Sequence, residues 1–161
     1  MTVAVVIGNP NPGGRTTTIG TTVGEAIAAA RSDSVTVREL ADVAPHLFEW
    51  GNEAVDALTA EVAAADVIVF ACPTYKATYT GLLKSFLDKY GPDGLAGTKS
   101  VPVMVGSALQ HALAPEVHLR PLLVELGSSV PTRGLYVLDS ELDQLDAAVA
   151  TWAESAVGLL T

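Results

Sequence analysis

The stretch VAVVIGNPNPGGRTTT (residues 3–18) runs from an apolar segment, through a loop rich in Gly and Pro, into the start of an Ala-rich segment. A continuous apolar run such as VAVVI is typical of a strand that is covered on both faces of its sheet. The Ala-rich segment that follows has the spacing of a helix. Together these features predict the first βα unit of a parallel sheet.

The same alternation continues along the rest of the chain. We expect strands at residues 3–7, 34–40, 66–71, 101–106 and 134–138, and helices at residues 16–31, 53–65, 79–90, 114–126 and 140–160. Five βα units joined by right-handed crossovers predict an α/β fold, with a doubly wound, five-stranded parallel sheet in the flavodoxin-like order 2-1-3-4-5. The length of 161 residues is that of a single domain, which we expect to span residues 1–161.

Composition and charge disfavour several classes of protein. A net charge of -9 argues against a nucleic-acid partner, because proteins that bind nucleic acids concentrate Lys and Arg on one face. Cys72 is the only cysteine, so no disulfide can form within the chain. No apolar run approaches the roughly 20 residues of a membrane span, and no signal-peptide pattern is present. We therefore expect a soluble, cytoplasmic protein without membrane contact.

Ligands on doubly wound sheets bind at the carboxyl ends of the strands, where the strand order reverses. Three segments occupy such positions: residues 8–18, CPTYKATYTG at residues 72–81, and GSALQH at residues 106–111. In the expected order, strands 1, 3 and 4 are neighbours. The three segments are therefore predicted to converge into one site.

The first of these segments has the chemistry of an anion-binding loop. Gly8, Gly13 and Gly14 allow close approach of the backbone and positive φ angles. Arg15 can form a fork with phosphate oxygens, and residues 16–18 offer hydroxyls and backbone N–H groups at a helix N-terminus. This combination suits a terminal phosphate. A Gly/Pro turn with a Thr cap is the alternative interpretation.

Three other phosphate motifs do not match. A Walker loop requires Lys at the position of Gly14, and the dinucleotide motif requires a second Gly where Pro10 stands. A cysteine phosphatase would place Arg six residues after Cys72, at the position of Thr78.

The second segment carries the most specific pattern. PTYKATYTGLLKSFLDKY (residues 73–90) closely resembles a segment of the NADPH-dependent FMN reductase family, in the branch that supplies reduced flavin to alkanesulfonate-type monooxygenases. HLRPLLVELGSSVPTRGLYV (residues 118–137) is similar to the fourth helix and last strand of that family. Related quinone and azo-dye reductases have Asn where this chain has Lys76, which favours the flavin-supplying branch. The first loop departs from the family, because NPNP replaces the usual Ser and Arg near residues 9–11.

The resemblance implies an enzyme that transfers hydride from NADPH or NADH to FMN. It places the FMN phosphate at the first segment and the flavin ring and ribityl chain at the other two. The implied residues are Asn9, Arg15, Thr16 and Thr17 for the phosphate; Pro73, Thr74, Tyr75, Lys76 and Ala77 for the ring and ribityl chain; and Gly106 and Ser107 for the ring edge. It also implies a homo-oligomer, either dimer or tetramer, and a two-component monooxygenase as the recipient of reduced flavin.

No catalytic acid or base is required, because hydride passes directly between stacked nicotinamide and flavin rings. No metal is predicted either, since the three histidines lack the spacing of metal ligands. Lys76 either stabilises negative charge on the reduced flavin or is simply solvated. Tyr75 is expected to pack on the flavin, while Tyr79 packs on the flavin or on a second subunit. Cys72 reads as a small buried residue, and His111 lies close enough to the third segment to touch flavin or nicotinamide.

Other predictions concern the helices. Pro121 within the fourth helix predicts a kink or bulge. The resemblance implies that this distortion has a role in the site or in assembly, with tolerated strain as the alternative. A dimer contact is expected from the apolar residues Leu82, Leu83, Phe86, Leu122 and Leu123. The last helix carries an apolar stripe that is either core or subunit contact, formed by Leu142, Leu145, Val149, Trp152, Ala156 and Leu159.

Two alternative functions remain. A flavodoxin-type electron carrier would hold FMN without a nicotinamide site, but the Thr/Ser-x-Thr-Gly-x-Thr loop of flavodoxins is not found in residues 8–18. A module that binds phosphosugars or nucleotides would leave the PTYKATYTG match unexplained.

Overall fold

A five-stranded parallel sheet forms the centre of the computed structural model, which describes residues 2–30 and 34–160. The strands are β1 (Thr2–Ile7), β2 (Ser34–Glu39), β3 (Val67–Pro73), β4 (Lys99–Gly106) and β5 (Leu135–Leu138). The α-helices are α1 (Arg15–Ala29), α2 (Glu53–Ala63), α3 (Gly81–Leu87), α4 (Arg120–Glu125) and α5 (Leu145–Ala156). The order β2-β1-β3-β4-β5, with every neighbouring pair parallel, confirms the predicted flavodoxin-like topology.

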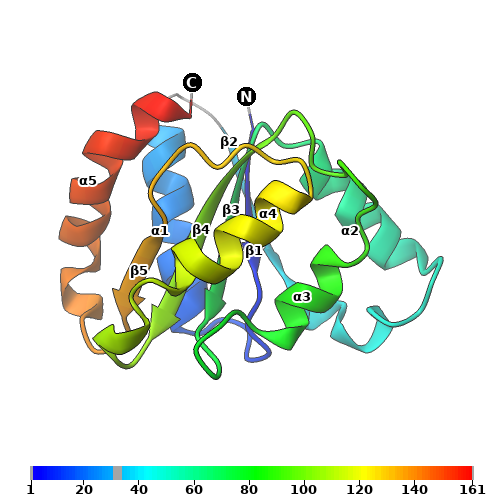
Figure 1. The fold of residues 1–161 in the computed structure, drawn as a ribbon, viewed down its shortest axis with the longest axis horizontal. Helices are drawn as coiled ribbons and strands as arrows, with labels where there is room; N and C mark the ends of the chain where they lie inside the picture. Colours follow the sequence, from blue (N-terminus) through cyan, green and yellow to red (C-terminus); the bar gives the residue numbers. More distant parts are fainter. Residues whose placement is uncertain (1, 31–33, 161) are drawn as a thin grey trace.

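Helices cover both faces of the sheet (Figure 1). Helices α1 and α5 pack on one face, and α2, α3 and α4 pack on the other. Successive residues of β1 alternate between the two cores: Val5 packs with α1 and α5, whereas Val6 packs with the other three helices. This double burial explains why the strands read as continuous apolar runs.

Helix α1 approaches the sheet closely because two of its residues lack side chains. A Cβ atom at Gly24 would lie 2.4 Å from Val5 Cγ2, and one at Gly20 would lie 2.7 Å from Ile7 Cδ1. The two glycines therefore allow the backbone of α1 to pack directly against β1.

Several elements differ in length from their predictions. Helix α3 starts only at Gly81, because the Thr80 side chain caps it by accepting from Leu83 N at 3.1 Å. The predicted last helix is divided, with short 3-10 turns before and after α5. Residue 31, the predicted end of the first helix, lies outside the described residues. No helix in the described ranges is long and apolar enough to cross a membrane.

The fourth helix contains the predicted bulge. A π-helical turn at Pro115–Leu119 precedes α4, and Arg120 N donates to Pro115 O across five residues. Pro121 then occupies the second position of α4, where it has no N–H to donate to the carbonyl groups of the preceding turn. The bulge thus lies before the proline and allows the chain to continue as a helix.

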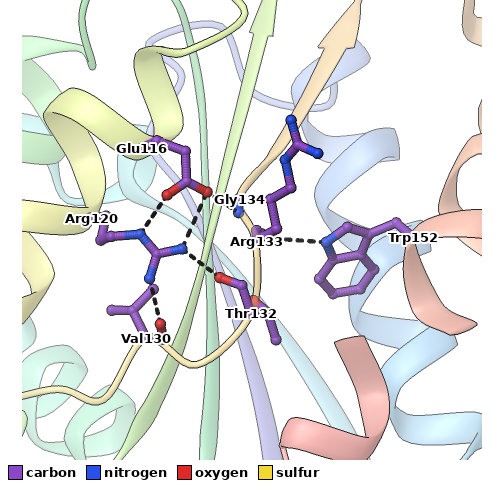
Figure 2. A network of polar contacts seen from close by, with 7 residues as sticks. All are labelled: Glu116, Arg120, Val130, Thr132, Arg133, Gly134 and Trp152. Carbon is purple, nitrogen blue, oxygen red and sulfur yellow. Dashed lines mark hydrogen bonds and ion pairs between the residues drawn. The ribbon is translucent and has the colours of Figure 1, made fainter. Parts of the chain in front are cut away.

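The π-helical turn is attached to the segment that leads into β5 (Figure 2). Glu116 accepts from Arg120 Nε at 2.5 Å and from Gly134 N at 2.5 Å. Arg120 in turn donates to the carbonyl oxygens of Val130 and Thr132. The hydrogen bonds from Arg120 hold the pKa of Glu116 below its usual value. We call this cluster the Glu116–Arg120 network.

The proposed contact residues require a correction. Leu83, Phe86 and Leu123 are completely buried in the core of their own chain, and Leu82 and Leu122 pack against that core. The three buried residues are therefore not available as a contact surface, whereas Leu82 and Leu122 remain partly exposed. In the last helix, Leu145, Val149, Trp152 and Ala156 are core residues, whereas Leu159 is exposed.

Candidate functional site

Three loops meet at the carboxyl edge of β1, β3 and β4, at the bottom of the sheet in Figure 1. We call them the first loop (residues 8–14), the second loop (residues 74–80) and the third loop (residues 106–111). Thr80 Oγ1 donates to Gly8 O at 2.6 Å and so joins the first two loops. Thr74 N donates to Val105 O at 2.6 Å, which joins the second loop to β4. The predicted convergence is therefore present.

Asn9 organises the interior of the first loop. It is 8% exposed, and its Oδ1 accepts from Asn11 N at 3.0 Å. Its Nδ2 donates to Thr16 Oγ1 at 3.2 Å. Both Asn9 and Thr16 are thus buried and bonded to each other. Gly13 takes a φ of 68°, which only glycine adopts at little cost.

Donors from the first loop and from the first turn of α1 face two carboxylates. Glu39 Oε1 accepts from Gly13 N at 3.0 Å and from Thr17 Oγ1 at 2.6 Å. Arg15 Nη1 lies 3.5 Å from Asp139 Oδ2, and the Arg15 side chain is 64% exposed. No side chain caps helix α1 at Gly14. The backbone N–H groups of its first turn are therefore not satisfied by a side-chain cap.

The second loop is a tight hairpin. Tyr75 N donates to Thr78 O at 2.9 Å, and Thr78 N donates to Tyr75 O at 3.2 Å. The two residues between them have positive φ, 52° for Lys76 and 69° for Ala77. A type I′ turn requires positive φ at both central positions and is usually built from Asn and Gly. Here Lys76 stands exposed at the tip of the turn.

We expect Ala77→Gly to stabilise the protein by about 0.5 to 1 kcal/mol. The substitution removes the clash of a Cβ atom in the left-handed conformation, and the greater entropy of glycine in the unfolded chain offsets part of the gain. Urea unfolding measures the change. The matched control is Ala150→Gly on the exposed side of α5, which should lose about 1 kcal/mol. Equal losses of unfolding free energy in the two variants would contradict the backbone strain assigned to the turn.

Tyr75 and Thr74 differ in exposure: the tyrosine is open to solvent, whereas the threonine hydroxyl is buried. Tyr75 is 44% exposed, so part of its side chain is available to a ligand. The Thr74 hydroxyl is buried and makes no hydrogen bond among the described residues. It approaches the Tyr136 hydroxyl without reaching hydrogen-bond geometry.

Tyr136, from β5, supports the third loop. Its hydroxyl donates to Ala108 O at 2.8 Å. A Cβ atom at Gly106 would lie 2.0 Å from the same hydroxyl, so the tyrosine can occupy this place only because residue 106 is glycine. Burial raises the pKa of Tyr136 above its usual value. Ser107, the next residue, is exposed at the edge of the site.

The single cysteine is not a reactive group. Cys72 is completely buried at the end of β3, and burial raises the pKa of its thiol to about 12. It therefore remains a neutral thiol at physiological pH. His111 lies in the third loop, with its Nε2 3.3 Å from Gln110 Nε2. Within residues 2–30 and 34–160, no group of three His, Cys, Asp or Glu side chains is placed to hold a metal ion.

The residues that were expected to bind FMN all lie on these three loops, on the ends of the adjoining strands or in the first turn of α1. They are Asn9, Arg15, Thr16, Thr17, Pro73, Thr74, Tyr75, Lys76, Ala77, Gly106 and Ser107. Four residues at the site were not predicted: Glu39, Thr80, Tyr136 and Asp139. A cap signal marks Thr80, since Thr precedes a helical run. Glu39 ends β2, Tyr136 lies in β5 and Asp139 directly follows β5, so only the tertiary fold brings these three residues to the site.

Comparisons with known proteins identify the family to which this chain is similar. The family described as NADPH-dependent FMN reductase matches residues 1–143. An FMN reductase (NADPH) of Escherichia coli is 33% identical over 93 residues, which are 58% of this chain and 49% of that protein. The NADH-dependent FMN reductase SfnE of Pseudomonas putida is 29% identical, covering 73% of this chain and 75% of the relative.

A solved structure extends the likeness to the fold. The apo form of the NADH:FMN oxidoreductase EmoB superposes with a TM-score of 0.80 and 28% identity, covering 96% of this chain and 89% of that one. The chain spans about half the length of the E. coli relative that it matches. Because the family match covers most of the sequence, the chain belongs to the NADPH-dependent FMN reductase family.

Proposed function

We propose that this chain is an NAD(P)H-dependent FMN reductase that binds FMN across the three loops. The observation that carries the proposal is the convergence of the first, second and third loops, which hydrogen bonds hold at the carboxyl edge of adjacent strands. When bound, FMN supplies a ring that accepts hydride from a reduced nicotinamide. The chain's own task is to position both rings and to stabilise the charges around them.

The first loop suits the phosphate of FMN. Gly13 N–H and the Thr17 hydroxyl already converge on one carboxylate oxygen, that of Glu39. An anionic oxygen is thus the kind of acceptor toward which these donors are aimed. The first turn of α1 adds its backbone N–H groups, and Arg15 has an exposed side chain that can reach outward. Asn9 and Thr16 hold the loop from inside.

The other two loops suit the flavin ring. Tyr75 offers an exposed aromatic surface, and the buried Thr74 hydroxyl has unused hydrogen-bonding capacity. At the opposite edge, Ser107 offers a small exposed side chain, and the Tyr136 hydroxyl lies against Gly106. Lys76, at the tip of the hairpin, brings a positive charge to a site in a chain of net charge -9. We assign it to the charge that develops on the reduced ring.

Anaerobic turnover tests the proposal. Purified protein mixed with FMN and either NADPH or NADH should bleach the flavin absorbance well above the uncatalysed rate. Activity should depend strictly on flavin and should be unchanged by EDTA. Binding of FMN with a background rate of bleaching for both nucleotides would identify an electron carrier instead.

We also propose that the protein works as a homodimer in the cytoplasm and passes reduced FMN to a two-component monooxygenase. Four exposed apolar residues support a contact between copies: Leu109, Leu113, Val117 and Val124. Leu113 follows the third loop just before the π-helical turn, Val117 lies within that turn, and Val124 lies in α4. Such a surface replaces the buried leucines that were first expected to form the contact.

Light scattering should therefore give twice the chain mass of 16.6 kDa at micromolar concentration. The double variant Leu113→Glu and Val117→Glu should give the mass of a single chain, because two charges would be buried in the contact. As a control, Glu154→Gln on the exposed surface of α5 should leave the mass unchanged. A single-chain mass for the unmodified protein would contradict the dimer.

A further inference from the structure

Glu39 is a negative charge at the phosphate end of the candidate site. It is the last residue of β2 and lies opposite Ile7, the residue before the first loop. Its Oε1 accepts both the backbone N–H of Gly13 and the hydroxyl of Thr17. Its Oε2 is buried and has no hydrogen-bond partner among the described residues. The carboxylate thus occupies the donors of the loop while part of its own hydrogen-bonding capacity is unused.

Neighbouring arginines do not neutralise this charge. Arg38 precedes it in β2 but pairs with Glu61, with Nη2 2.8 Å from Glu61 Oε1. Arg15 turns toward Asp139 instead. No ion pair of Glu39 is present in the part of the chain that the structure describes.

We propose that Glu39 competes with the flavin phosphate for the first loop and thereby keeps the affinity for FMN low. The inference rests on the proposed function of the loop. Gly13 N and Thr17 Oγ1 each carry one hydrogen, so a phosphate that binds them must displace the carboxylate. A phosphate that uses only the backbone of α1 and Arg15 would lie beside an unpaired negative charge. In both cases the penalty falls on phosphorylated flavin and spares riboflavin.

This arrangement fits a reductase that releases its reduced flavin. Among related complexes, weaker affinity appears mostly as faster dissociation. When the Glu39 carboxylate bonds again to Gly13 N and Thr17 Oγ1, it weakens FMN binding without altering the pocket for the flavin ring. Glu39 therefore sets how strongly the protein distinguishes FMN from riboflavin.

The test compares Glu39→Gln with the unmodified protein by titrating each with FMN and with riboflavin. Glutamine keeps the length and the carbonyl acceptor but removes the charge. We expect the dissociation constant of FMN to fall by about three- to tenfold, while that of riboflavin stays the same. The gain should shrink at high salt, because salt screens the repulsion. Glu39→Ala should also tighten FMN, which provides a second variant.

Glu25→Gln is the matched control, because it changes net charge equally from the exposed face of α1, about 15 Å along the helix from Arg15. It should leave both dissociation constants unchanged. Unchanged or weaker FMN binding in both Glu39 variants, or an equal change for riboflavin, would overturn the proposal.

Binding of inorganic phosphate tests the role of Glu39 independently of the reductase function. If neither flavin binds any form of the protein, the reductase function fails. Thermal unfolding with phosphate then decides the role of Glu39, because phosphate should stabilise Glu39→Gln more than the unmodified protein. Equal stabilisation of the two proteins by phosphate would overturn the competition.

Discussion

Replacing Arg15 with alanine is expected to weaken FMN binding by about ten- to a hundred-fold and to leave riboflavin binding almost unchanged. The guanidinium group is mostly exposed, and its contact with Asp139 is long, at 3.5 Å. A pair of this kind contributes little to stability. Arg15 can therefore leave Asp139 at small cost and form a charge-assisted pair with the flavin phosphate. Fluorescence titration with both flavins measures the two affinities.

Arg133→Ala serves as the control, since it removes the same charge from an exposed position at the opposite end of β5. It should leave both affinities nearly unchanged. A loss for riboflavin equal to the loss for FMN in Arg15→Ala would show general damage to the site. An unchanged FMN affinity would mean that Arg15 is a solvated residue of the turn.

The second large effect concerns the Glu116–Arg120 network (Figure 2). We expect Arg120→Ala to lower the free energy of unfolding by about 2 to 3 kcal/mol. The change leaves the half-buried Glu116 carboxylate without its ion pair, and it removes the donors to Val130 O and Thr132 O. Arg38→Ala is the control, because it breaks a more exposed pair with Glu61. That variant should lose less than about 1 kcal/mol.

The loss in Arg120→Ala should also depend on pH. Arg120 lowers the pKa of Glu116 in the folded state below its ordinary value of 4.5. The ionised carboxylate therefore contributes stability above about pH 4.5, and this contribution disappears as the pH falls through the lower, folded-state pKa. Urea unfolding near neutral pH and below pH 4 should show a smaller difference between the two proteins in acid. The same difference at both pH values would contradict the ion pair as the source of stability.

The fold was predictable because the central strands β1, β3 and β4 are covered on both faces. Residues such as Val5 and Val6 face different helical layers, so the strand appears in the sequence as an unbroken apolar run. Apolar character alone does not separate core from contact surface. Leu83 and Phe86 were therefore expected at a subunit contact, although both lie in the core.

The site was predictable only in part. In the first loop, Gly13, Gly14 and the threonines that follow predict a phosphate-binding loop from the sequence alone. The second loop gives no local signal of its turn type, because Lys76 and Ala77 replace the Asn and Gly that usually mark positive φ. Glu39 reaches the first loop from the end of β2, and Asp139, directly after β5, reaches Arg15 at the start of α1. No spacing within the sequence reports such contacts, which depend on how the whole sheet is assembled.

The burial of Cys72 makes this protein a convenient host for chemical labelling. Its thiol is the only one in the sequence, and its pKa of about 12 leaves almost no thiolate near neutral pH. A maleimide reagent should therefore not react with the unmodified chain. A cysteine introduced at the exposed Ser107 would then carry a dye at the rim of the site as the sole modified position, without any need to remove the native residue.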